Sequence, residues 1–108
     1  MEYRKLNGSG LFVPALTLGT GTFGGSHGFE NWGHAGVSEA TRMVDMCLNA
    51  GLNMFDTADM YSQGLAEEIL GKAETWKVHH VSISSRLARQ VCIVLAQTIS
   101  TFIIFSWI

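Results

Sequence analysis

Apolar residues recur with a helical period between residues 38 and 50. Positions i, i+3, i+4, i+7 and i+8 are occupied by Ala40, Met43, Val44, Cys47 and Leu48, which therefore share one face of a helix. Ser38 lies just ahead of this face and is a suitable N-cap residue. Gly51 suits the left-handed position that ends many helices. A second helix is predicted over residues 64–73, where Leu65, Ile69, Leu70 and Ala73 lie on one side.

Short apolar runs bounded by turn residues predict strands around these helices. Two of them flank the turn sequence Asn7-Gly8-Ser9-Gly10, which is typical of a β-hairpin. From residue 15 onward strands and helices alternate, a pattern that indicates parallel βα units. The glycine-rich segment 19–36 has no periodicity and is predicted to be a long loop. The predicted strands are 2–6 and 11–13 of the hairpin, followed by 15–18, 52–55 and 78–85.

Charge and cysteine content exclude several classes of protein. The net charge is −2 and the pI is about 6.0, so the chain lacks the basic surface expected of a nucleic-acid-binding protein. Two cysteines are too few for a disulfide framework and fit a reducing compartment. The opening residues MEYRKLNGSG contain no apolar core of a signal peptide. We therefore expect a cytoplasmic protein.

The composition changes near residues 74–76. All 12 glycines lie at or before Gly71, and residues 90–108 carry no charge. The apolar run 91–108 reaches the lower length limit for a membrane-spanning helix, but five scattered Gln, Thr and Ser residues interrupt it. A buried helix or strand, or a tail unrelated to the rest, is favoured over a membrane anchor. The expected division is therefore 1–86 and an uncharged apolar tail, 87–108.

The segment GLNMFDTADMY, residues 51–61, carries the best candidates for chemistry. Asp56 follows a predicted strand, and Tyr61 lies on the loop after it. Enzymes with α/β folds place their active sites at such strand ends. From spacing alone a structural interpretation is as good: Asp56 caps a turn with Thr57, and Tyr61 packs on the rim of the sheet.

The residues of this segment resemble the signature of the aldo-keto reductases around their catalytic aspartate and tyrosine. The resemblance runs from Met1 to about Ala73, through YRKLNGSGLFVPALTLGTGTFGG and GVSEATRMVDMCLNAGLNMFDTADMYSQGLAEEILGKA. It implies an α/β fold of the (β/α)8 TIM-barrel type. Because a complete barrel needs about 250 residues, 108 residues are expected to form a partial, truncated barrel. That part is an N-terminal hairpin plus about three βα units.

The resemblance also implies a reaction, in which hydride passes between NADPH and an aldehyde or ketone. Tyr61 matches the general acid of the family, and Asp56 matches the aspartate that supports it. Gly21, Thr22 and Phe23, at the tip of the first barrel strand, are expected to approach the nicotinamide end of NADP, with Asp56 at the same corner. Trp32 either faces the substrate or packs the long loop down.

The chain departs from the family pattern in several places. Aligning VSISSR with the comparable strand of the family puts Arg86 where the family has a lysine, and the alternative is that Arg86 is an exposed residue flanking the strand. Nothing beyond residue 86 resembles the segment with the catalytic histidine. Arginine is planar and keeps its proton, so the exchange is not conservative. Gly19 to Gly24 satisfies GxGxxG, but no helix begins there, which excludes a Rossmann fingerprint. We therefore expect a weak or inactive enzyme, or a non-catalytic remnant that associates through an open sheet edge. No metal site is expected, because His79 and His80 are adjacent and would point to opposite faces of a strand.

Overall fold

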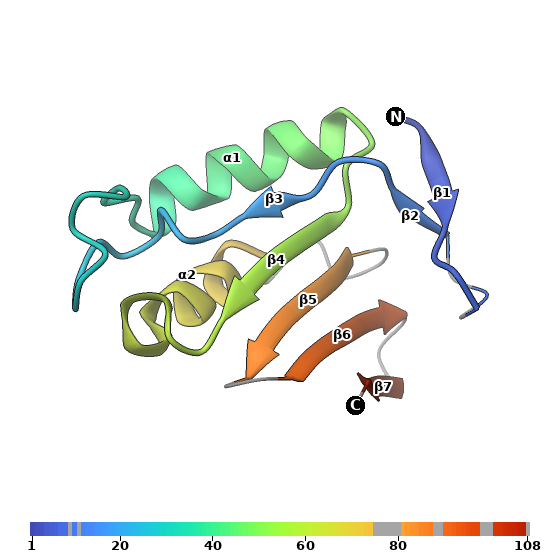
Figure 1. Cartoon of the computed structure of the whole chain (residues 1–108). Helices are drawn as coiled ribbons and strands as arrows, with labels where there is room; N and C mark the ends of the chain where they lie inside the picture. The colour runs from blue at the N-terminus through green and yellow to red at the C-terminus, as the bar shows by residue number, and fades with distance from the viewer. Residues whose placement is uncertain (9, 11, 75–80, 88–89, 98–100, 108) are drawn as a thin grey trace.

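The protein is described by a computed structural model that covers all 108 residues. The structure describes residues 1–8, 10, 12–74, 81–87, 90–97 and 101–107, and from residue 74 onward only the main chain. Figure 1 shows an N-terminal hairpin, two helices and a sheet whose later strands extend away from the helices.

The predicted hairpin is confirmed. Strands β1 (Tyr3–Lys5) and β2 (Phe12–Pro14) pair antiparallel, with Tyr3 opposite Pro14 and Lys5 opposite Phe12. The turn between them has left-handed backbone at Gly8 and Gly10. The Tyr3 hydroxyl donates a hydrogen bond of 2.7 Å to the carbonyl oxygen of Gly51, which fastens the hairpin to the far end of the first helix.

Three parallel strands follow, in the predicted order. Strands β3 (Leu18–Gly19), β4 (Met54–Ala58) and β5 (Val81–Leu87) lie side by side. The expected start of β3 at residue 15 is wrong, because the amide of Ala15 still donates to the Glu2 carbonyl and belongs to the hairpin. The expected start of β4 at residue 52 is also wrong, because the amide of Leu52 donates to the Cys47 carbonyl at the helix end.

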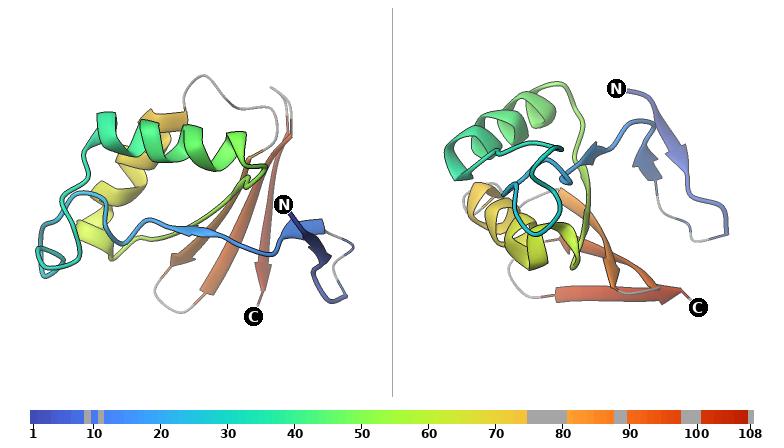
Figure 2. Two further views of the ribbon diagram at one scale, coloured as in Figure 1. Left: turned by 90° about the horizontal axis from the view of Figure 1, so that it is seen from above. Right: turned by 60° about the vertical axis from the view of Figure 1, so that its left-hand side comes forward.

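The helices α1 (Val37–Asn49) and α2 (Leu65–Glu74) cover the same face of β3 and β4 (Figures 1 and 2). The predicted apolar faces form the core together with Phe23 and Phe55, although Leu65 is exposed. Ser38 is not the N-cap: Gly36 is, because its carbonyl already accepts the amide of Ala40. Gly51 adopts the predicted left-handed conformation after the helix.

The third strand is not followed by a helix in the described residues. Strands β6 (Gln90–Gln97) and β7 (Thr101–Trp107) continue the sheet antiparallel, which gives the order β3-β4-β5-β6-β7. The described chain therefore forms an open sheet with two βα units and a third strand, and not a closed barrel. Neither described helix has the length and apolar character required to cross a membrane.

Candidate active site

Tyr61 lies in a tight turn at the carboxyl end of β4. The strand ends at Ala58, and the 3-10 turn Tyr61–Gly64 leads directly into α2. The half-buried Tyr61 ring contacts two rings of the long loop after β3, at centroid distances of 5.4 Å from Phe29 and 6.4 Å from Trp32. Phe29 and Trp32 are themselves edge to face at 5.1 Å. These three residues, Phe29, Trp32 and Tyr61, form an aromatic cluster.

Gly21 brings the end of β3 into contact with this aromatic cluster. A Cβ atom placed on Gly21 would lie 3.0 Å from Cε3 of Trp32 and 3.9 Å from Cζ of Tyr61, the carbon that carries the phenol oxygen. The rings can approach the main chain this closely because Gly21 has no side chain. The structure thus brings together two predicted site residues, Gly21 and Tyr61. Trp32 packs against Phe29 and Tyr61 and remains 60% exposed.

Asp56 lies in the middle of β4 and not after its end. It pairs with Gly19 on one side and with Ser84 on the other, and its carbonyl accepts the amide of Thr20 at 2.9 Å. Because side chains alternate along a strand, Asp56 lies on the face opposite the buried residues Phe55 and Thr57. Its carboxylate is half-buried on the sheet face that the helices leave uncovered.

Thr22 and Phe23 occupy different environments at the end of β3. Thr22 is exposed, and its carbonyl accepts the amide of Ala35 at 3.1 Å. The Phe23 ring is completely buried in the core. Its amide donates to the carbonyl of Thr20 at 2.9 Å, so Phe23 contributes to this corner by anchoring the main chain.

Ser62 is a member of the site that the sequence reasoning missed. Its side chain is 2% exposed, its hydroxyl donates to the Phe23 carbonyl at 3.2 Å, and it accepts the amide of Ser26 at 3.2 Å. Ser62 and Gln63 both have left-handed backbone, with φ of 49° and 53°. Such a conformation costs a residue with a side chain about 1 kcal/mol. No local sequence pattern around Ser62 predicts either its hydrogen bonds or its left-handed backbone.

Arg86, the residue aligned with the lysine of the family, lies on the neighbouring strand β5. Arg86 is opposite Ala58 in the β4–β5 register, while Asp56 is opposite Ser84. His79 and His80 lie outside the described residues. Within the described part, no group of three or more metal-ligating side chains gathers.

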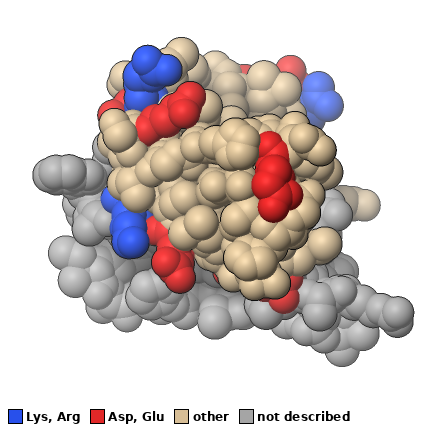
Figure 3. Space-filling model, turned by 90° about the vertical axis from the view of Figure 1, so that its left-hand side faces the viewer, with Lys and Arg blue, Asp and Glu red and all other residues tan. Residues whose placement is uncertain are grey.

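The surface around the aromatic cluster carries little charge. Figure 3 shows the end of the molecule where the long loop and the first turn of α2 lie, with a largely uncharged centre and charged side chains scattered around it. On α1, burial raises the pKa of the Cys47 thiol, so this thiol is protonated at neutral pH and is not an activated nucleophile.

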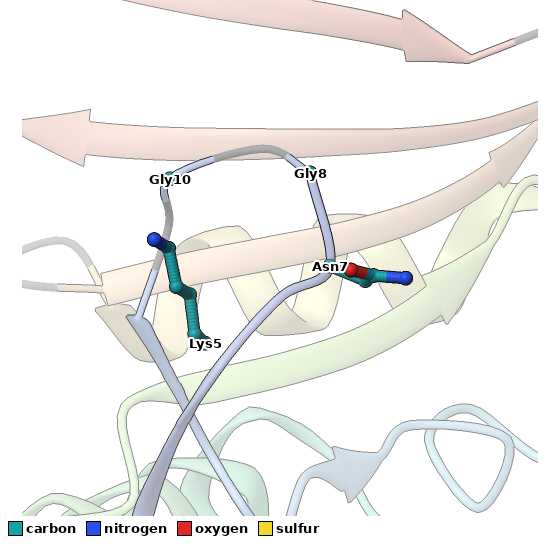
Figure 4. A pocket seen from close by; sticks show the side chains of 4 residues that line it. All are labelled: Lys5, Asn7, Gly8 and Gly10. Carbon is teal, nitrogen blue, oxygen red and sulfur yellow. The ribbon is translucent and has the colours of Figure 1, made fainter.

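A hollow of about 490 Å³ lies elsewhere, inside the turn of the hairpin (Figure 4). It is lined by Lys5, Asn7, Gly8 and Gly10. The hairpin is on the opposite side of the molecule from the long loop in Figures 1 and 2. This hollow therefore has no part in the site built around Tyr61.

The chain is similar in sequence to proteins of one family. A sequence profile of the Aldo/keto reductase family matches residues 15–98. A probable voltage-gated potassium channel subunit beta from Oryza sativa subsp. japonica is 37% identical over 91 residues, which are 81% of this chain and 25% of that protein. Versiconal hemiacetal acetate reductase from Aspergillus parasiticus is 41% identical over 73 residues, which are 68% of this chain and 21% of that protein.

The fold comparison points the same way. The holo form of an aldo-keto reductase from Bacillus halodurans superposes with a TM-score of 0.56 and 35% sequence identity, over 71% of this chain and 22% of that one. The chain thus spans about a quarter or less of the length of these relatives. Since the family profile matches well over half of its residues, the chain belongs to the aldo/keto reductase family.

Proposed function

We propose that this chain carries the N-terminal part of an NADP-dependent oxidoreductase that interconverts small aldehydes or ketones and alcohols. The observation that carries the proposal is the proximity of Gly21 to Tyr61 at the carboxyl ends of neighbouring parallel strands. This end of an α/β sheet is where catalytic groups gather. Family membership supplies the reaction type.

The exposed polar groups at this corner fit the polar part of a nicotinamide nucleoside. Thr22 offers an exposed hydroxyl, and Asp56 offers a half-exposed carboxylate that accepts hydrogen bonds. Bound NADPH supplies the hydride. Phe23 acts on this corner only through its main chain, because its ring is buried.

Tyr61 is the proposed general acid. When hydride adds to a carbonyl carbon, the oxygen gains negative charge and takes up a proton, which the Tyr61 hydroxyl donates. A phenol has a pKa near 10, so efficient transfer requires positive charge nearby to stabilise the phenolate. Arg86 pairs in register with Ala58, the last residue of the strand that leads to Tyr61, and is the proposed source of this positive charge. The proposed role of Asp56 is to hold that positively charged side chain in place. We propose that Arg86 takes the place of the expected lysine, and that the 108 residues alone are therefore a weak catalyst or inactive.

The test is binding of NADPH to the purified chain, followed by nicotinamide fluorescence, together with turnover of 4-nitrobenzaldehyde. Tyr61→Phe is the matched control, because it removes only the phenol oxygen. Turnover that the control loses by at least about 100-fold establishes Tyr61 as the acid and contradicts the proposed inactivity. Binding without turnover locates the defect in the missing lysine and histidine. Absence of binding refutes the proposed cofactor site.

A second candidate function is association, which the open sheet favours. In the described residues the sheet ends at β3 on one side and at β7 on the other. A bare strand edge can pair with another chain. A non-catalytic chain of this kind would bind barrel fragments or full-length relatives, and co-purification with one of them distinguishes it from the enzyme. In either case we propose a cytoplasmic location, consistent with the free thiol of Cys47.

A further inference from the structure

The buried hydroxyl of Ser62 joins the two segments that form the candidate site. It belongs to the residue that follows Tyr61, and both of its hydrogen bonds cross to the loop after β3. The hydroxyl donates to the Phe23 carbonyl and accepts the Ser26 amide, each at 3.2 Å. With an exposed fraction of 2%, the side chain has water largely excluded from it. A buried hydrogen bond of this kind fixes its two partners in one arrangement.

The main chain to which Ser62 is bound is itself anchored. The Phe23 amide donates to Thr20, and the Thr20 amide donates to Asp56 in β4. Gly21 lies between Thr20 and Phe23, so the Ser62 hydroxyl ties the Tyr61 turn to the short segment that carries Gly21. Gly24 leaves the room required: a Cβ on Gly24 would lie 3.1 Å from both Cβ and Oγ of Ser62.

The backbone of Ser62 is unusual for a serine. Its φ of 49° and ψ of 37° lie in the left-handed region, which glycine adopts without steric strain. A residue with a side chain stays in this region only when its surroundings hold it there. Compared with glycine, what serine adds at this position is the hydroxyl and its two hydrogen bonds.

We infer that Ser62 is a positioning residue for Tyr61, whose hydroxyl holds the phenol ring against Gly21 and the aromatic cluster. The inference rests on the proposed function only in so far as Tyr61 acts as the general acid. The placement of the ring is a separate property that is measurable in an inactive chain. Ser62 itself touches no reacting atom.

The experiment observes the Tyr61 ring directly. In a Tyr3→Phe background Tyr61 is the only tyrosine, so incorporation of 3-fluorotyrosine gives a single 19F resonance. Neighbouring aromatic rings displace this resonance from its position in the unfolded chain. Ser62→Ala and Ser62→Gly both remove the hydroxyl, but only glycine relieves the left-handed strain. We expect both variants to move the resonance most of the way toward the unfolded position, with the far-ultraviolet circular dichroism unchanged.

Ser26→Ala is the matched control, because its side chain contacts His27 and only its main-chain amide binds Ser62. Its resonance should remain at the parent position. Ser62→Cys keeps the shape of the side chain and weakens its hydrogen bonds, so its resonance should lie between those of the parent and of Ser62→Ala. It replaces Ser62→Ala in the comparison if that variant does not fold. An unmoved resonance in folded Ser62→Gly overturns the inference. Failure of NADPH to bind leaves this measurement intact, so the two proposals fail separately.

Discussion

At the scale of single residues, the loop after β3 depends on glycines with left-handed backbone. Gly25 has a φ of 66°, and a Cβ there would collide with the Gly33 carbonyl oxygen and the His34 imidazole. Gly28 has a φ of 94°, but nothing lies within 4 Å of the corresponding Cβ position. Substitutions at Gly25 and Gly28 therefore distinguish the cost of backbone strain alone from the cost of strain plus steric collision.

We predict that Gly25→Ala lowers the free energy of unfolding by about 3 kcal/mol, since strain and overpacking add. Gly28→Ala should lower it by about 1 kcal/mol, from backbone strain alone. Urea denaturation followed by tryptophan fluorescence measures both values. Equal losses for the two variants would show that the loop relaxes around the added methyl group.

Some residues of the candidate site could be predicted from the sequence, and others could not. Gly21, Asp56 and Tyr61 stand in segments whose residues resemble a known family, so they were candidates from the start. Ser62 was not, because its partners Phe23 and Ser26 lie 39 and 36 positions away. Which side chains meet over such separations is decided by packing, and no local pattern encodes it.

At the scale of the elements, periodicity predicted the helices well and the strand limits poorly. The apolar face of α1 was correct because burial against β4 and α2 selects the same positions that a helical repeat groups. Strand ends were wrong by two or three residues where the hydrogen bonds of Ala15 and Leu52 go to neighbouring elements. Those bonds depend on the assembled fold and are invisible in local composition.

The face of α1 gives a direct test of that packing. Val44 is completely buried, and Val44→Ala should lower the free energy of unfolding by about 2 kcal/mol through the cavity it leaves. Met46, two residues later on the same helix, is 66% exposed. Met46→Ala removes more atoms but should change stability by less than about 0.5 kcal/mol. A comparable loss at both positions would place the core of the protein elsewhere.

At the scale of the whole molecule, the sheet departs from what the sequence predicted. The order of strands and helices through β5 was correct, but the uncharged stretch after residue 90 was compatible with either a helix or a strand. In the structure it extends the sheet by two antiparallel strands, which leaves β7 at one edge of the described sheet. An uncharged edge strand has none of the lysines that commonly prevent pairing between chains.

We predict that the chain associates through this edge. Its molar mass in light scattering should increase with concentration, and Ile104→Lys in the middle of β7 should reduce the increase because an edge charge disfavours strand addition. Met46→Lys adds the same charge on the exposed side of α1 and should leave the increase unchanged. A parent chain that stays monomeric at all concentrations contradicts the prediction.

The parallel pairing of β3 with β4 also fixes when the site can form during synthesis. Leu18 pairs with Phe55, and the Tyr3 hydroxyl donates to the carbonyl of Gly51, so β3 and Tyr3 leave the ribosome long before these partners. Gly21 meets Tyr61 only after both helix α1 and strand β4 have emerged. Strand β3 must therefore wait without its partner, and the glycine-rich loop after it stays accessible to chaperones and proteases until β4 has been synthesised.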